Sequence, residues 1–130
     1  MDPRSLEVRV DALPSSRHVR ILVDGELVAD STRTTVLYET GLPPRYYLPK
    51  SDVRMDLLAS TDSVSGCPYK GWAEYWNVTA GGRSHEDLAW GYRAPFPESE
   101  AVAGLICFYN EKVDIELDGV VIERPKTKFS

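Results

Sequence analysis

The sequence predicts a mainly β domain in which short antiparallel strands form a compact barrel or a pair of packed sheets. Asp-Gly pairs at 24–25 and 118–119 each separate two alternating segments, β-branched and aromatic runs recur between them, and helical patterns are nearly absent. Asp-Gly between alternating strands is the strongest short hairpin signal, because both turn positions need a positive φ. Many short strands with few helices are typical of barrels and sandwiches.

The remaining strands are expected from local composition. The run TTVLYE is β-branched and aromatic, which suits a strand. Two later segments are expected to pair around a Gly81-Gly82 turn, and the apolar run AGLICFY suits a strand buried on both faces. The expected strands, in chain order, are 18–23, 26–30, 34–39, 71–79, 83–92, 103–109, 113–117 and 120–122.

Turns and loops are expected to fill the intervals, with at most one or two short helical turns. One helical turn is expected after Pro49, where Ser51 would cap it and Asp52 would suit its positive end. The polar segment 60–66 and the proline-containing segment 93–101 are expected to be loops.

Length and composition favour one domain. The chain has 130 residues, enough for one core and too few for two. We expect an N-terminal extension or strand at 1–14, a single β domain at 15–123 and a C-terminal tail at 124–130. The only basic cluster lies in this tail and is expected to be solvated: Arg124, Lys126 and Lys128.

Charge and cysteine content exclude several classes of function. The net charge is −5, and an acidic chain without a basic stripe is poorly suited to nucleic acid. No secretory signal or membrane-length apolar run is visible, so we expect a cytoplasmic protein without membrane contact. Two cysteines and two histidines without a Cys-x-x-Cys pair do not make a structural zinc site, and no metal or other cofactor is expected.

The first candidate site lies in ETGLPPRYYLP, residues 39–49. Glu39 and Arg45 flank a proline-stiffened loop, so their side chains are expected to return to the same region. Arg45 would clamp an anionic ligand while Glu39 acts as base, or the two would form a structural ion pair. Tyr46 and Tyr47 are expected to point to opposite faces, one toward the core and one toward a ligand-binding groove.

The second candidate site lies in CPYKGWAEYW, residues 67–76. Lys70 is interpreted as a ligand contact or a base, and the alternative is a solvated lysine. Cys67 is interpreted as a nucleophile, and the alternative is a small buried thiol. Trp72, Glu74 and Trp76 are expected to share one strand face, which suits a groove wall or a dimer interface. The aromatic ligand-binding candidates of this segment are Tyr69, Trp72, Tyr75 and Trp76.

Three stretches together resemble the domain-of-unknown-function 427 family, which is widespread in bacteria and is sometimes labelled nucleotidyltransferase-like. They are ETGLPPRYYLPKSDV, CPYKGWAEYW and AGLICFYNEKVDIELDG, and the resemblance covers roughly residues 15–120. It implies a compact β fold similar to the β-tent of Mss4-like proteins without their zinc cysteines, and it implies no established reaction. The nucleotidyltransferase label has no support in the residues, because a glycine-rich phosphate loop and a metal-binding aspartate pair are absent.

The sequence therefore favours a small-molecule-binding β domain whose aromatic-lined pocket takes an anionic ligand, with catalysis left open. Glu39, Lys70 and Cys67 are the catalytic candidates, and Arg45 with the aromatic residues would hold the ligand. The alternative is a non-catalytic interaction module or homodimer, because tryptophan, tyrosine and arginine are favoured at interface centres.

Overall fold

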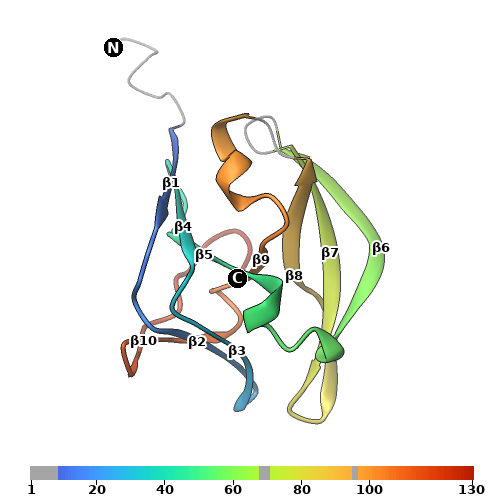
Figure 1. Ribbon diagram of the computed structural model, residues 1–130. Coiled ribbons are helices and arrows are strands. Elements are labelled where there is room, and N and C mark those ends of the chain that lie inside the picture. The colour runs from blue at the N-terminus through green and yellow to red at the C-terminus, as the bar shows by residue number, and fades with distance from the viewer. Residues whose placement is uncertain (1–8, 68–70, 95–96) are drawn as a thin grey trace.

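The protein consists of two antiparallel sheets, seen in a computed structural model that describes residues 9–67, 71–94 and 97–130 (Figure 1). The seven-stranded sheet has the order β1-β4-β5-β9-β8-β7-β6. Its strands are β1 (Val10–Pro14), β4 (Thr35–Glu39), β5 (Arg45–Leu48), β6 (Leu58–Cys67), β7 (Gly71–Ala80), β8 (Arg83–Ala94) and β9 (Ile106–Phe108).

The four-stranded sheet joins the two ends of the domain. It has the order β11-β10-β2-β3, with β2 (Val19–Val23), β3 (Glu26–Ser31), β10 (Asp114–Leu117) and β11 (Val120–Val121). Within the described residues neither sheet closes on itself, so the mainly β class is confirmed as packed sheets rather than as a closed barrel.

All three hairpins predicted from glycine-containing turns are present. Asp24 and Asp118 have φ of 48° and 51°, and the glycine after each has φ above 80°. This is the conformation that a two-residue turn between twisted strands requires. The Gly81-Gly82 turn likewise joins β7 to β8. The pairing of β10 with β2 then merges the first and last hairpins into one sheet.

The predicted loop at 60–66 is wrong, because these residues belong to strand β6. They pair with β7, with a register irregularity between Ser60 and Val64. β6 lies at the edge of its sheet, so its polar side chains are tolerated there and no alternating apolar pattern marks it. The segment 93–101 is also not entirely loop, since β8 extends to Ala94 and a 3-10 helix η4 (Pro97–Val102) follows.

A short 3-10 helix η2 (Lys50–Asp52) follows Pro49 as predicted, but its cap is different. Pro49 itself is the N-cap and makes no side-chain capping bond. The Ser51 hydroxyl instead accepts a hydrogen bond from Arg33, 2.9 Å away, and the Asp52 carboxylate accepts from Ser31. A second 3-10 turn, η3 (Met55–Leu57), leads into β6.

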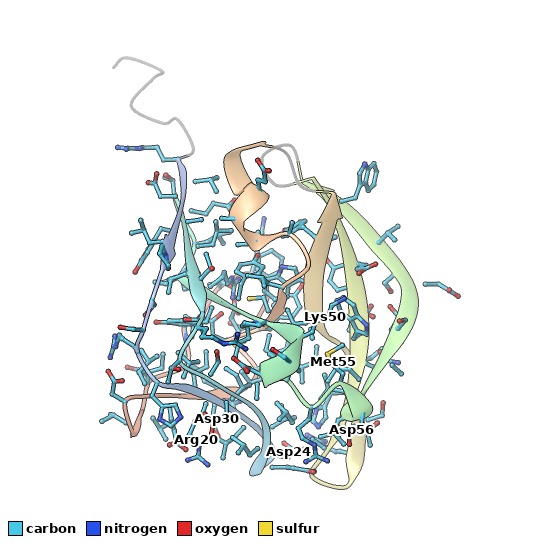
Figure 2. The ribbon with its side chains drawn as sticks, in the orientation of Figure 1. Arg20, Asp24, Asp30, Lys50, Met55 and Asp56 are labelled. Carbon is cyan, nitrogen blue, oxygen red and sulfur yellow. The ribbon has the colours of Figure 1, made fainter. Side chains whose placement is uncertain are left out.

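The seven-stranded sheet is apolar on both faces. One face packs against the four-stranded sheet through side chains such as Ile21, Ile115, Trp76 and Phe108. Arg20 and Asp30 project from the other side of the four-stranded sheet, away from this core (Figure 2).

The opposite face of the seven-stranded sheet holds a second, mostly aromatic cluster. Its buried members are Leu37, Tyr47, Ala73, Trp90, Tyr92, Val102 and Cys107. β9 contributes to both cores, because Ile106 and Phe108 point to the first and Cys107 points to the second. The predicted strand buried on both faces is therefore confirmed, over fewer residues than expected.

No helix within the described ranges is long and apolar enough to cross a membrane.

Candidate functional site

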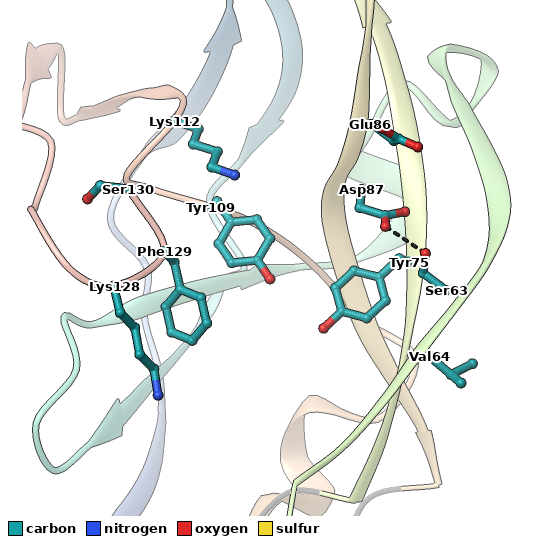
Figure 3. A pocket seen from close by; sticks show the side chains of 10 residues that line it. All are labelled: Ser63, Val64, Tyr75, Glu86, Asp87, Tyr109, Lys112, Lys128, Phe129 and Ser130. Carbon is teal, nitrogen blue, oxygen red and sulfur yellow. Dashed lines mark hydrogen bonds between the residues drawn. The ribbon is translucent and has the colours of Figure 1, made fainter.

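A cleft of about 520 Å³ opens between strands β6 to β8 on one side and the loop after β9 with the C-terminal segment, residues 124–130, on the other (Figure 3). Ser63, Tyr75 and Asp87 come from the strand side. Tyr109, Lys112, Lys128 and Phe129 come from the opposite side. The cleft thus combines segments that are far apart in the sequence.

On the side of the cleft formed by the loop after β9 and the C-terminal segment, tilted aromatic rings lie against one another and two ammonium groups lie over them. The Tyr109 ring lies 4.4 Å from that of Trp90 and 5.8 Å from that of Phe129, between centroids. Lys112 Nζ lies 5.3 Å from the centroid of Tyr109, and Lys128 Nζ lies 5.2 Å from that of Phe129. These distances are within the range of cation–π attraction, so each ring helps to position a positive charge.

Burial, with the neighbouring Tyr75 phenol, raises the pKa of the Tyr109 phenol above its ordinary value. Tyr109 therefore stays protonated at neutral pH.

Beneath these rings lies a buried ion pair between Arg45 and Glu111. Arg45 Nη2 is 2.9 Å from Glu111 Oε2, and Nη1 donates both to Glu111 Oε1 and to the amide oxygen of Asn110. Only 3% of Arg45 is exposed. Thr127 adds a 2.6 Å bond from its hydroxyl to Glu111 Oε2, so the C-terminal segment is tied to the same carboxylate.

The charges of this pair are mutually stabilised. Burial acts to raise the pKa of the Glu111 carboxyl, but the hydrogen bonds from Arg45 and Thr127 outweigh it and lower that pKa. Burial is the largest influence on the pKa of Arg45 and acts to lower it, but the hydrogen bond to Glu111, the charge of Glu111 and neighbouring groups together raise that pKa. Both groups are therefore ionised at neutral pH, as a buried pair with satisfied hydrogen bonds requires.

The strand side of the cleft is organised by Asp87, which has a φ of 49° within β8. Its carboxylate accepts hydrogen bonds from the hydroxyls of Ser63, at 2.6 Å, and Thr61, at 2.8 Å. Its backbone N–H donates to Asn77 Oδ1 at 2.9 Å. The left-handed backbone at Asp87 coincides with a register shift between β7 and β8, where a bulge turns side chains in new directions.

A family model described as Domain of unknown function (DUF427) matches residues 11–119. The chain belongs to the DUF427 family. No curated protein matches it. The predicted resemblance is therefore confirmed, and the matched range ends before the C-terminal segment that lines the cleft.

Arg45 of this DUF427 domain binds a carboxylate, but in the described residues that carboxylate is Glu111 rather than the expected Glu39. Arg45 pairs across the sheet with Leu37, and Glu39 lies two residues farther along β4. Glu39 lines a different cleft, of about 330 Å³. Of the two interpretations of Arg45, the geometry favours the structural ion pair, since its guanidinium is bound internally.

Tyr46 and Tyr47 point to opposite faces as predicted. Tyr47 is fully buried, and its hydroxyl accepts a 3.2 Å hydrogen bond from the Trp90 indole. Tyr46 is half-buried against the first core. Tyr47 is therefore a core residue and has no exposed surface for a ligand.

The residues predicted to form a site within 67–76 have different outcomes. Tyr69 and Lys70 lie outside the described residues, and for Cys67 only the backbone is described, paired with Gly71 at the end of β6. Tyr75 lines the cleft, and its role in binding a ligand stays a prediction.

The two tryptophans of this segment have different surroundings. Trp72 is 64% exposed, whereas Trp76 is 7% exposed and belongs to the first core. The two rings therefore do not form one groove wall. Trp72 lies exposed near the start of β7, whereas Trp76, in the middle of the strand, is packed in the core.

Most residues of the cleft were missed by sequence reasoning. Tyr109 and Lys112 stand in YNEK, directly after strand β9. Polar residues at the end of a buried strand could have marked this position as a candidate site. The C-terminal segment was expected to be a solvated tail, yet Thr127 and Phe129 pack onto the domain and Arg124 pairs with Asp114. Nothing local in that basic segment indicated its docking.

Among the described residues no group of histidine, cysteine, aspartate and glutamate side chains is arranged to hold a metal ion.

Proposed function

We propose that this DUF427 domain binds a small anionic ligand in the cleft between strands β6 to β8 and the C-terminal segment. The observation that carries the proposal is the pair of ammonium groups, Lys112 and Lys128, each placed over an aromatic ring on one side of a cleft of about 520 Å³. That volume lies within the range of roughly 300–1,000 Å³ typical of small-molecule sites.

The electrostatics of the cleft support an anion. Neither lysine has a carboxylate partner among the described residues, so both charges are available to a ligand. In a chain of net charge −5, these two cations make their own side of the cleft favourable for an anion within an unfavourable overall field.

Rigidity beneath the cleft also supports binding. Arg45 lies 5.9 Å from the ring centroids of both Tyr109 and Phe129 and is itself held by Glu111. The rings are thereby ordered before a ligand arrives, which reduces the entropy lost on binding. The sequence predicted that Arg45 would contact the ligand. We now propose Lys112 and Lys128 as the ligand contacts, because Arg45 is bound by Glu111.

Thermal unfolding with a panel of small anions, including inorganic phosphate and mono- and dicarboxylates, tests the proposal. At least one anion should raise the midpoint of wild-type protein, and Lys112→Ala/Lys128→Ala should lose that shift because both proposed contacts are gone. Lys126→Ala is the matched control, since Lys126 is exposed in the same segment and does not line the cleft. An undiminished shift in a folded double variant would refute the proposed site.

The second candidate function is self-association through the β6–β7 face. Trp72 and Val64 are 64% and 69% exposed, and the cross-strand pairs Gly66–Trp72 and Val64–Glu74 place both side chains on one face. β6 is an edge strand, which offers unpaired backbone groups to a second copy. Light scattering across a concentration series should then reveal a dimer that Trp72→Ala weakens, whereas a monomer at every concentration would count against it.

A further inference from the structure

We infer that the ligand of the cleft is dipolar, carrying an amine at one end and a carboxylate or phosphate at the other. The amine would be bound by Asp87 and Glu86 and the anion by Lys112 and Lys128. This inference rests on the proposed function, because it concerns the same cleft and adds a second recognition element to it.

The charges of the cleft are separated by sign. In Figure 3 Lys112 and Lys128 extend from the side that carries Tyr109 and Phe129, while Asp87 and Glu86 lie with the strands on the other side. Lys112 directs its ammonium group toward the space between the two sides. A ligand lying across the cleft therefore meets positive charge at one end and negative charge at the other.

None of these four charges is neutralised by an ion pair within the described residues. Elsewhere on the protein, exposed groups of opposite charge are closely paired, as in Arg17–Asp118 at 2.9 Å and Arg83–Asp24 at 2.7 Å. The Asp87 carboxylate accepts bonds only from the neutral hydroxyls of Ser63 and Thr61 in the described part of the chain. The cleft thus keeps two positive and two negative charges available on opposite sides.

The position of Asp87 is held in place by the fold. Its left-handed backbone, its N–H bond to Asn77 and the two hydroxyl bonds fix the carboxylate at the edge of the cleft. Each carboxylate oxygen has a second lone pair, so the bonds to Ser63 and Thr61 leave acceptor capacity for a ligand N–H. Aspartate and asparagine tolerate this backbone conformation better than other residues with a side chain do.

Charge on both sides selects against ligands with a single sign. A dianion spanning the cleft would be repelled by Asp87 and Glu86, and a diamine would be repelled by the lysines. An amino acid with separated ends satisfies both sides. The Tyr109, Phe129 and Tyr75 rings would then contact the apolar chain between its two charges.

Titrations with matched straight-chain acids test the inference. For each chain length from four to eight carbons, the ω-amino acid is compared with the unsubstituted acid, the ω-hydroxy acid and the dicarboxylate, and binding is followed by amide chemical shifts. At the best length the amino acid should bind about fivefold more tightly than the unsubstituted acid, as a partly exposed charge pair contributes. The hydroxy acid should lie between them, and the dicarboxylate should bind most weakly.

The double variant Glu86→Gln/Asp87→Asn should abolish the preference for the amino acid, while the unsubstituted acid should bind at least as tightly as before because two negative charges are gone. Asparagine at position 87 tolerates a positive φ and keeps one oxygen that can accept a hydrogen bond from the hydroxyls. If the double variant does not fold, the same titrations are made with the single variant Glu86→Gln. Asp62→Asn is the control, because Asp62 is exposed beside Ser63 and does not line the cleft.

The outcomes separate this inference from the proposed function. Unsubstituted acids that bind and depend on the lysines, with no gain from the amine, would overturn the dipolar ligand and leave anion binding intact. A dicarboxylate that binds more tightly than the amino acid would overturn it as well. An absence of shifts around the cleft with every acid would refute the proposed function first.

Discussion

The Arg45–Glu111 pair is the interaction on which the most cleft residues depend. Its guanidinium contacts the rings of Trp90, Tyr109 and Phe129, and its carboxylate holds Thr127. A buried charge is costly unless its partner remains, so losing one member costs more than losing the pair. The pair therefore acts as a structural support for the cleft.

Arg45→Met is expected to lower the free energy of unfolding by about 3–5 kcal/mol, because it leaves the Glu111 carboxylate buried without its cation. The double variant Arg45→Met/Glu111→Leu should recover a large part of this loss. Urea denaturation of these two variants, of Glu111→Leu alone and of the wild type completes a double-mutant cycle. Losses that add without recovery would show that the pair is not coupled as the geometry indicates.

Gly81 and Gly82 share one turn but differ in what a side chain would meet. A Cβ on Gly81 would lie 2.3 Å from Cβ of Asp24, whereas a Cβ on Gly82 would meet nothing within 4 Å. Both have positive φ, of 62° and 83°. Gly82→Ala should therefore cost about 1 kcal/mol of backbone strain.

Gly81→Ala should cost clearly more, since the β2–β3 and β7–β8 turns must also move apart. Denaturation midpoints of the two variants measure the difference. Equal losses of stability would mean that the two turns can move apart without lowering the free energy of unfolding.

Among the elements, the C-terminal segment has the least predictable role. It lies beyond the range that the DUF427 family model matches, yet it supplies Phe129 and Lys128 to the cleft. Internal bonds shape it, with Thr127 N–H donating to the hydroxyl of Ser130 and Phe129 N–H donating to that of Thr127. The segment is consequently a folded part of the cleft.

Thr127→Val should lower the free energy of unfolding by about 1.5–3 kcal/mol, because it removes a hydroxyl bond to a buried, charged carboxylate while preserving shape. Lys126→Ala, at an exposed position of the same segment, should have almost no effect. Thermal or urea unfolding compares the two. A Thr127→Val protein as stable as the control would show that the segment is not anchored through Glu111.

The β6 strand shows where sequence reasoning about an element fails. Val64 is mostly exposed, and Thr61 and Ser63 bond to Asp87 instead of packing into a core. Periodicity identifies a strand only when one face is apolar. By contrast, the three glycine-containing turns were predicted correctly, because their backbone conformation is a property of the turn residues themselves.

At the scale of the whole molecule, several carboxylates have pKa values lowered in the folded state. Hydrogen bonds from arginine lower the pKa of Asp24, Asp52 and Asp118, and Glu111 has a net shift in the same direction. A group whose folded pKa lies below its unfolded pKa stabilises the fold above the unfolded value. That stabilisation is lost as the pH falls through the folded value.

Stability should therefore decline as the pH falls below about 4.3, the ordinary value for glutamate, and should continue to decline toward lower pH. Glu111→Gln should be less stable than wild type at neutral pH, and the difference should narrow in acid because protonation removes the same charge. Urea midpoints measured between pH 7 and pH 3 check this. A difference that stays constant with pH would show that ionisation of Glu111 does not contribute.

The sequence by itself determined the β class, the hairpin turns, the family and the opposed directions of Tyr46 and Tyr47. These follow from interactions within a few residues, where turn conformation and strand alternation act directly. Only the tertiary structure decided that Arg45 pairs with Glu111, that Asp87 reaches Ser63 and that the tail completes the cleft. Those contacts join residues 24 to 66 positions apart or depend on how the last segment docks. Charge and hydrogen-bonding capacity can be read from each residue, but the partner of each group is set by packing of the whole chain.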